Sequence, residues 1–170
     1  MHFFRIVRPA LAAASLLATV ITSAADLSGT YENAGILVSS ATAQPEGTIS
    51  FQGLLSLEFD YALARALHAE TNRVTIRQTE THFTIECRNL DDQVTWSRRW
   101  QKGAGYGVEG DRAELVFRAP QLKDDAYVFS LQRVPQRDLL LVTVERLNAT
   151  SFGPSAQPVG TFLFGRLAGE

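Results

Sequence analysis

The sequence predicts a mainly β protein, an antiparallel meander of eight or nine strands with one helix between the first strand and the rest. From residue 73 onward apolar and polar residues alternate, as expected for strands with one buried face. Turn residues interrupt this alternation at short, regular intervals. Only the stretch 55–70 has apolar residues at helical spacing.

The first strand is predicted around Leu27–Tyr31, where apolar residues and glycine alternate with polar ones. The helix follows over 55–70, with Ser56 as its N-cap and Asn72 as its end. The glycine-rich segment 103–111 leads from one strand into the next. The remaining strands are predicted at 73–78, 82–87, 93–101, 112–118, 126–133, 138–147 and 158–167.

Consecutive hairpins of this kind form either an up-and-down barrel or a β-sandwich. We favour the barrel, because closing the sheet leaves no exposed strand edge. The strands around Gly29–Tyr31 and 160–164 are the two that we expect to meet and close it.

The first 25 residues have the organisation of a secretory signal peptide. Arg5 and Arg8 precede an apolar run that is too short to span a membrane comfortably, and small residues follow it, with cleavage expected after Ala25 or Ala24. The mature chain, residues 26–170, is then a single domain in the periplasm or outside the cell. It contains no further segment that is apolar for long enough to cross a bilayer.

The residue inventory offers little for catalysis or cofactors. Without the signal peptide the formal net charge changes from −2 to −4, which gives no electrostatic basis for binding nucleic acid. The only G-x-G-x-x-G spacing, 105–110, leads into a strand and not a helix, and no G-x-S-x-G motif occurs. His68 and His82 lie on polar faces, and Cys87 lies on an inward face where it is expected to pack as a small apolar residue. We therefore expect no cofactor, metal or catalytic residue, and an enzyme is the less favoured class.

The first strand carries Gly29, Thr30 and Tyr31, where lipocalins and fatty-acid-binding proteins begin with glycine, any residue and tryptophan. A helical insertion at 55–70 before the hairpins, and an arginine near the last strand, Arg166, are further points of similarity. The chain thus resembles the calycin-type β-barrels in plan, with tyrosine in place of the tryptophan. The resemblance implies a barrel that binds a small apolar or amphipathic ligand.

The stretch 95–100, TWSRRW, contains both tryptophans of the chain. On a strand, Val94, Trp96, Arg98 and Trp100 share one face, which is the apolar and therefore inward one. Other arginines also have the parity of apolar residues on their strands: Arg133, Arg146 and Arg166.

Two functions remain open from these residues. A lumen with aromatic walls and guanidinium groups at Trp96, Arg98, Trp100, Arg133 and Arg166 would suit an amphipathic anion, because guanidinium makes bidentate contacts with carboxylate or phosphate. Alternatively, arginines at strand ends extend into water and Arg98 stacks on the indoles, in a barrel filled by side chains. The protein would then be a cell-envelope interaction module or inhibitor with a protein partner.

Overall fold

The computed structural model describes residues 26–41, 48–56, 70–118, 125–134, 136–150 and 153–168. The predicted signal peptide and residues 57–69 of the predicted helix lie outside the described residues, as does His68. Among the described residues, no helix is long and apolar enough to cross a membrane.

The predicted mainly β fold is confirmed, with ten strands in one sheet and a single short helix among the described residues. The sheet exceeds the predicted eight or nine strands because the three-residue β2 and the glycine-rich β6 both pair with neighbours. The elements are β1 Gly29–Ser40, β2 Thr48–Ser50, α1 Phe51–Leu55, β3 Thr71–Gln78, β4 His82–Asn89, β5 Val94–Lys102, β6 Gly105–Glu109, β7 Arg112–Arg118, β8 Asp125–Val134, β9 Leu139–Thr150 and β10 Gly153–Arg166.

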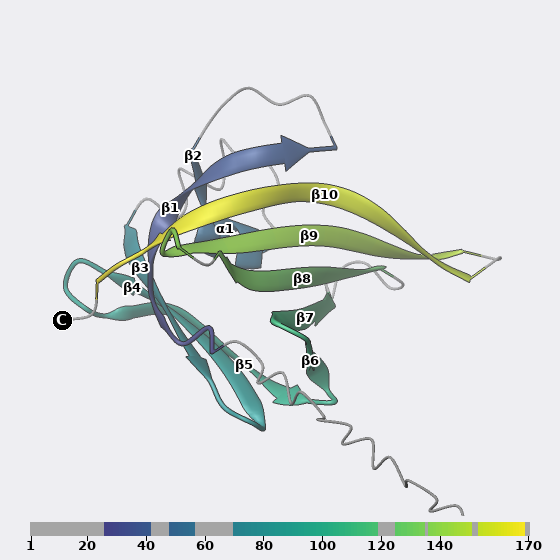
Figure 1. The fold of residues 1–170 in the computed structure, drawn as a ribbon, viewed down its shortest axis with the longest axis horizontal. Coiled ribbons are helices and arrows are strands. Elements are labelled where there is room, and N and C mark those ends of the chain that lie inside the picture. The colour runs from purple at the N-terminus through teal and green to yellow at the C-terminus, as the bar shows by residue number, and fades with distance from the viewer. Residues whose placement is uncertain are drawn as a thin grey trace, which may run out of the picture.

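The strands form a closed ring. Their order is β10-β9-β8-β7-β6-β5-β4-β3-β1-β2, and an additional pairing between β1 and β10 joins the two ends of the meander, as the sequence predicts (Figure 1). In that pairing Tyr31 lies opposite Arg166, and Gly35 opposite Phe164. β1 therefore lies between β10 and β3 in the ring, because its first residues also pair with β3.

The ring has one weak junction, between β5 and β6. Every other pairing of neighbouring strands is antiparallel, whereas β5 and β6 pair in parallel and only at Gln101–Gly105 and Lys102–Tyr106. The chain makes a tight loop there through Gly103, which has φ +77°. The rest of β5 has no partner strand on that side within the described part of the chain.

The helix α1 is not the predicted one: it spans Phe51–Leu55 and shares only Leu55 with the predicted stretch 55–70, of which residues 57–69 lie outside the described residues. The Ser50 side chain, and not that of Ser56, caps its N-terminus by accepting a hydrogen bond from the Gly53 N–H at 3.1 Å, and Ser56 is the C-cap. The prediction placed the N-cap at Ser56 because that serine precedes the longer helical pattern in the sequence. The start is decided instead by buried Asn33 on β1, whose Oδ1 accepts the Gln52 N–H at 2.9 Å.

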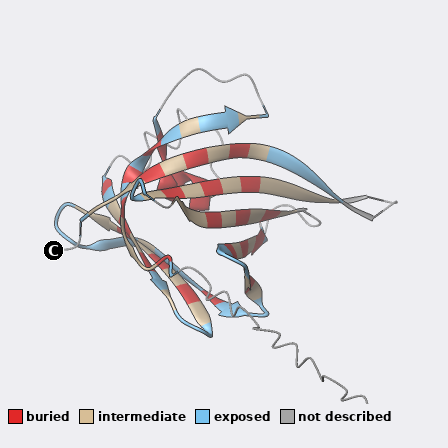
Figure 2. Ribbon diagram, in the orientation of Figure 1, coloured by how far each residue is buried: buried red, intermediate tan, exposed pale blue. Residues whose placement is uncertain are grey.

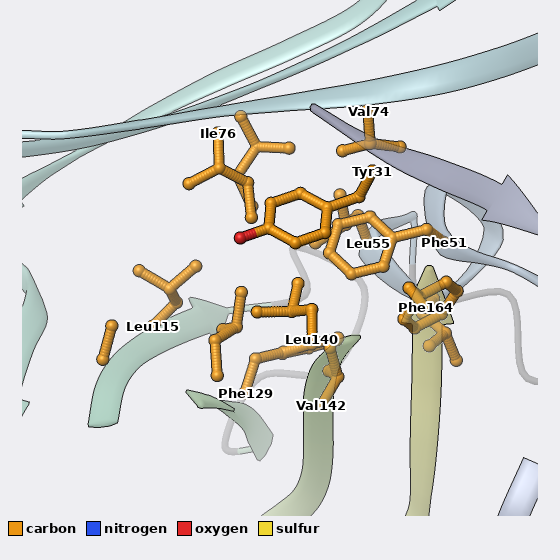
Figure 3. Packing of buried hydrophobic residues seen from close by; sticks show 14 of the residues in the cluster. Tyr31, Phe51, Leu55, Val74, Ile76, Leu115, Phe129, Leu140, Val142 and Phe164 are labelled. Atoms are coloured by element: carbon orange, nitrogen blue, oxygen red, sulfur yellow. The ribbon is translucent and has the colours of Figure 1, made fainter. Parts of the chain in front are cut away.

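Side chains of the described strands pack closely in the centre of the ring. Residues on β8, β9 and β10 alternate between buried and partly exposed, as Figure 2 shows. Phe51 and Leu55 of α1 pack among Tyr31, Val74 and Phe164 (Figure 3). Several central side chains have no accessible surface at all: Phe83, Ile85, Leu115, Phe117, Leu131, Leu140, Val144, Phe162 and Phe164. Since a side chain beside a water-sized void would keep accessible surface, these residues pack directly on one another.

Candidate functional site

The tryptophan cluster lies on β5 and faces the interior. Trp96, Arg98 and Trp100 lie opposite Cys87, Ile85 and Phe83 of β4, respectively, all of which are fully buried. The three residues share a face as predicted, but only Trp100 is buried on it; Trp96 is partly buried and Arg98 is exposed.

Trp100 is part of the wall. Only 4% of its surface is exposed, and its ring centroid lies 4.9 Å from that of Phe117, edge to face. The ring centroid of Trp96 lies 6.4 Å from that of Trp100, and Trp96 is only partly buried. Among the described residues, the buried Nε1 of Trp100 has no hydrogen-bond acceptor.

The side chain of Arg98 lies over the rings of Trp100 and Phe117. Its guanidinium carbon lies 5.2 Å from the centre of the Trp100 ring and 4.8 Å from that of Phe117, which are cation–π distances. The residue is nevertheless exposed, and the described residues include no acidic partner for it. Partial desolvation lowers the pKa of Arg98, but an arginine so placed stays protonated.

Val94 departs from the prediction. The register between β4 and β5 shifts so that Trp96 lies opposite Cys87 and Val94 opposite Arg88, which leaves Thr95 as an extra residue. Thr95 instead donates through its hydroxyl to the Cys87 carbonyl at 3.2 Å. The bulge removes Val94 from the inward face, and 49% of its surface is exposed.

The outer edge of β5 carries backbone groups that no described strand pairs. Lys102 N–H points towards β4, where it donates to the Thr81 carbonyl, and the Gln101 carbonyl points the other way, where it accepts from Ala104 N–H. Because backbone groups alternate along a strand, the N–H groups of Ser97 and Arg99 point away from β4. No described strand meets them there.

Arg133 and Arg166 lie away from this cluster. Arg166 donates to the Ser28 carbonyl at 3.0 Å and lies against Gly29, where a Cβ atom would come within 2.8 Å of its Nε. Arg133 is half-exposed and lies 3.3 Å from the carboxylate of Asp138. The five predicted ligand-binding residues thus form two groups, and the two arginines make structural contacts.

The predicted closure segment Gly29–Tyr31 also has structural partners. Tyr31 is buried, and its hydroxyl donates to the Leu27 carbonyl at 2.8 Å. Burial raises its pKa above the ordinary value of a tyrosine, although the charge of Arg166 acts in the opposite direction. Arg146, the fourth arginine of apolar parity, lies opposite buried Tyr127.

Cys87 is a buried core residue, as predicted. It has no accessible surface, and burial raises the pKa of its thiol to about 12. A thiol that stays protonated at neutral pH is a poor nucleophile.

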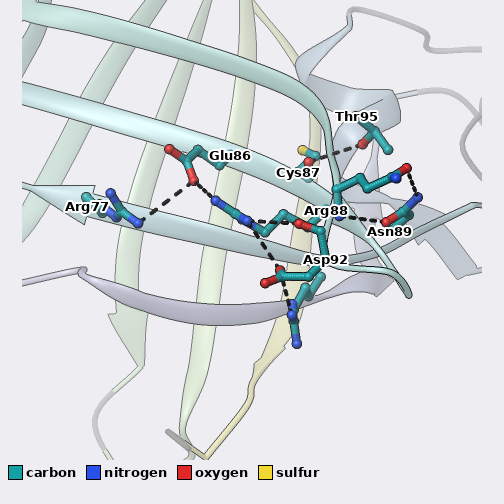
Figure 4. A network of polar contacts seen from close by, with 9 residues as sticks. Arg77, Glu86, Cys87, Arg88, Asn89, Asp92 and Thr95 are labelled. Carbon is teal, nitrogen blue, oxygen red and sulfur yellow. Dashed lines mark hydrogen bonds and ion pairs between the residues drawn. The ribbon is translucent and has the colours of Figure 1, made fainter.

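A groove on the outer face of β1, β3 and β4 brings together residues that sequence analysis did not single out. It has a volume of about 590 Å³, and three arginines line it: Arg73, Arg77 and Arg88. Arg73 and Arg88 both contact Asp92, at 2.6 and 3.3 Å, and Arg88 and Arg77 contact Glu86, at 2.7 and 4.0 Å (Figure 4). The hydrogen bond from Arg73, with help from Arg88, lowers the pKa of Asp92.

A sequence signal for the groove does exist. Arg73, Thr75 and Arg77 have the outward parity of β3, and the hairpin with β4 brings Arg88 opposite Arg73. Alternating arginines on a polar face are, however, also the ordinary composition of a solvated strand face.

No protein-family model matches the chain, and no curated protein is significantly similar to it in sequence. Among the residues that the structure describes, no three histidine, cysteine or acidic side chains are grouped to hold a metal ion.

Proposed function

We propose that this protein is a non-enzymatic interaction module of the cell envelope, which binds an extended segment of a partner protein along the outer edge of β5. The observation that carries the proposal is the outward backbone of Ser97 and Arg99 in β5, which no strand among the described residues pairs, beside the weak β5–β6 junction. Exposed strand edges are sites where a second chain can add a strand.

The packing of the interior supports a surface function over a ligand carried in the lumen. The inward side chains of β4, β7, β9 and β10 are almost all without accessible surface. Small-molecule sites inside β-barrels instead need an enclosed cavity of some hundreds of Å³. Since these side chains occupy the lumen, we expect a partner to bind at a strand edge or on the outer face of the sheet.

The edge offers a regular set of hydrogen-bonding groups. Ser97 and Arg99 direct both N–H and C=O away from β4, so an added strand would form a ladder without disturbing the existing one. The side chain of Val94 and the partly buried ring of Trp96 give apolar surface beside this ladder. Both sets of contacts are typical of strand addition.

The charge of β5 indicates the kind of partner. Arg98, Arg99 and Lys102 are its charged residues, and the strand contains no acidic one. All three are exposed. We therefore propose an acidic partner segment, since complementary charges guide association and fix register.

Basic residues on an edge strand also have a protective role, because they discourage edge-to-edge aggregation. The two roles make different predictions for a soluble acidic strand. Protection alone leaves such a peptide unbound, whereas the proposed function predicts that it pairs with β5.

The proposal includes export and the calycin plan. The ring of strands, loosely barrel-like, is compatible with that plan, and the features of residues 1–25 support delivery to the periplasm or the exterior. Mass spectrometry of the protein recovered from that compartment tests export. A mature chain that begins at Asp26 or Ala25 agrees with it, and an uncleaved chain in the cytoplasm contradicts it.

The binding test uses a synthetic peptide of about eight residues that alternates glutamate and valine, with a lysine–valine peptide of equal length as control. Amide hydrogen exchange of the purified protein is followed with and without peptide. We expect the acidic peptide to slow exchange at Ser97 and Arg99, and the lysine peptide to leave both amides unchanged. Unchanged exchange with both peptides would contradict the proposal.

A matched pair of variants separates edge pairing from charge attraction. Ser97→Pro removes one outward N–H and spares the β4 ladder, whereas Ser97→Ala keeps the N–H and removes only the hydroxyl. We expect Ser97→Pro to abolish protection at Arg99 by the acidic peptide and Ser97→Ala to retain it. Equal binding by the two variants, both folded by circular dichroism, would overturn pairing along this edge.

A further inference from the structure

We infer that the arginine-lined groove on the outer face of β1, β3 and β4 binds a small, polar organic molecule through a phosphate group. The groove is separate from the β5 edge, so this inference does not depend on the proposed partner. It has three supports: the shape of the groove, the fixed positions of its guanidinium groups and its excess of positive charge.

The groove has a floor and a wall. Thr30 of β1 and Thr75 of β3 lie opposite one another in the strand pairing and provide hydroxyl groups on the floor. Residues Leu167 and Ala168, which follow β10, form one wall, held in place by a hydrogen bond of 2.8 Å from Leu167 N–H to the Thr30 carbonyl. The volume of about 590 Å³ falls within the range of pockets that hold a whole small molecule.

Two of the guanidinium groups are held in place by one carboxylate. Asp92, in the turn between β4 and β5, contacts Arg73 at 2.6 Å and Arg88 at 3.3 Å. Its backbone has φ +62°, the left-handed conformation that few residues other than glycine adopt. Arg88 also donates to the Asp92 carbonyl at 3.0 Å. Arginines fixed in this way lose little freedom when a ligand arrives.

The groove lining has positive charge and free donors. The described residues that line it include three arginines and one carboxylate, Asp92, which leaves an excess of two positive charges in the lining. Two further carboxylates lie beside the groove: Glu86, paired with Arg88 and Arg77, and Glu32, opposite Arg73 in the β1–β3 pairing. Arg77 is the least engaged, because the only ion pair it makes with a described residue is 4.0 Å long and 66% of its side chain is exposed. Each guanidinium has five N–H donors, and the contacts with carboxylates use few of them.

The lining indicates the class of ligand. Guanidinium forks match the oxygens of phosphate bidentately, and several arginines can share one phosphate group. Threonine hydroxyls beside them can donate to or accept from a hydroxylated body. Among the described residues of the lining, only Leu167 and Ala168 are apolar, so the body of the molecule is expected to be polar.

Calorimetric titration of the purified protein with glucose 6-phosphate, glucose and inorganic phosphate tests the inference. We expect the sugar phosphate to bind with a Kd below about 1 mM at low salt, and more tightly than inorganic phosphate. Glucose should not bind. Raising the salt concentration to about 0.5 M should weaken binding, because screening acts on exposed charges.

Variants assign the binding to the groove. Arg77→Gln and Arg73→Gln should each raise the Kd of the sugar phosphate about tenfold, as expected for the loss of a charged hydrogen-bond donor. Arg112→Gln, an exposed arginine on β7 outside the groove, is the matched control and should leave the Kd unchanged. Arg77 is the more exposed of the two targets, so its substitution is expected to leave the fold intact.

Each other outcome overturns part or all of the inference. Equal Kd values for inorganic and sugar phosphate would assign the groove to free phosphate and remove the organic ligand. Binding that Arg77→Gln and Arg73→Gln leave unchanged would move the site elsewhere. Absence of binding by both phosphates at about 1 mM would exclude the inference.

Discussion

The ring of Phe164 lies over the backbone of Gly35, its partner in the pairing that closes the ring. A Cβ atom on Gly35 would come within 2.3 Å of Phe164 Cε1 and 2.8 Å of the Leu163 carbonyl oxygen. The same phenylalanine meets Phe51 of α1 edge to face, with ring centroids 4.5 Å apart. Phe164 thus joins the closure of the sheet to the packing of the helix, and glycine at position 35 leaves the space it needs.

Gly35→Ala is therefore expected to lower the free energy of unfolding by about 2–3 kcal/mol, because neither a packed ring nor a backbone carbonyl can yield cheaply. Urea unfolding followed by circular dichroism measures the change. Gly107→Ala is the control, since a Cβ there meets nothing within 4 Å. Equal midpoints for the two variants would contradict this account of the closure.

The second prediction concerns the buried amide that fixes the start of α1. Asn33 accepts the Gln52 N–H at 2.9 Å and donates to Ser50 Oγ at 3.0 Å and the Thr71 carbonyl at 3.1 Å. Asn33→Leu is similar in size but leaves these buried groups without partners. We expect a loss of stability of about 2–4 kcal/mol, from one or two unsatisfied polar groups.

Ala34→Leu, at the exposed neighbouring position, controls for the added apolar side chain in the second prediction. It should change the unfolding midpoint little. If Asn33→Leu unfolds at the same urea concentration as this control, the amide does not hold the helix.

The strands were predictable because their signal is local. The inward positions of Phe83, Ile85 and Cys87 follow from alternation within one short segment, and all three are fully buried. The closure between β1 and β10 could also be anticipated, since a meander with apolar inward faces leaves only its first and last strands to pair.

The features that the sequence did not predict depend on residues that are distant from one another in the chain. The start of α1 depends on Asn33, which lies 17 residues from Ser50 and 19 residues from Gln52 in sequence. The exposure of Val94 follows from a register shift that alternation does not predict. The groove requires arginines from two strands, a turn aspartate and the C-terminal segment together, and each of these alone has the composition of solvated surface.

The third prediction concerns the thiol of Cys87. Its folded-state pKa of about 12 lies above the ordinary value of 9.0. The folded state therefore keeps the proton that the unfolded chain releases above pH 9. The stability associated with the neutral thiol is complete below that pH and is lost progressively as the pH rises towards 12.

Between about pH 8 and about pH 10, the native protein should lose about 1.4 kcal/mol more stability than Cys87→Ala, which has no thiol to titrate. Unfolding in urea across this range measures the difference. Parallel pH profiles would contradict a buried, neutral thiol. A water-soluble maleimide gives an independent check: it should label the unfolded protein and spare the folded one.

The last prediction asks whether Trp100 is retained for packing or for its N–H. The ring fills the wall against Phe117, while the buried Nε1 lacks an acceptor among the described residues. An unpaired buried N–H costs about 1–3 kcal/mol, so Trp100→Phe removes a penalty while it sacrifices some apolar volume. We expect that variant to lie within about 1 kcal/mol of the native stability, whereas Trp100→Ala should lose about 3–5 kcal/mol through the cavity it creates.

Trp96 supplies the comparison for this last prediction, because it neighbours Trp100 on the same face but is only partly buried. Trp96→Ala should cost clearly less than Trp100→Ala, in proportion to the apolar area each ring buries. If Trp100→Phe instead lost several kcal/mol of stability, the indole N–H would have a hydrogen-bond partner, and Trp100 would do more than fill space. With the predicted order of stabilities, Trp100 is a packing residue, and the part of the cluster left for recognition is Trp96 and Arg98 at the open edge of β5.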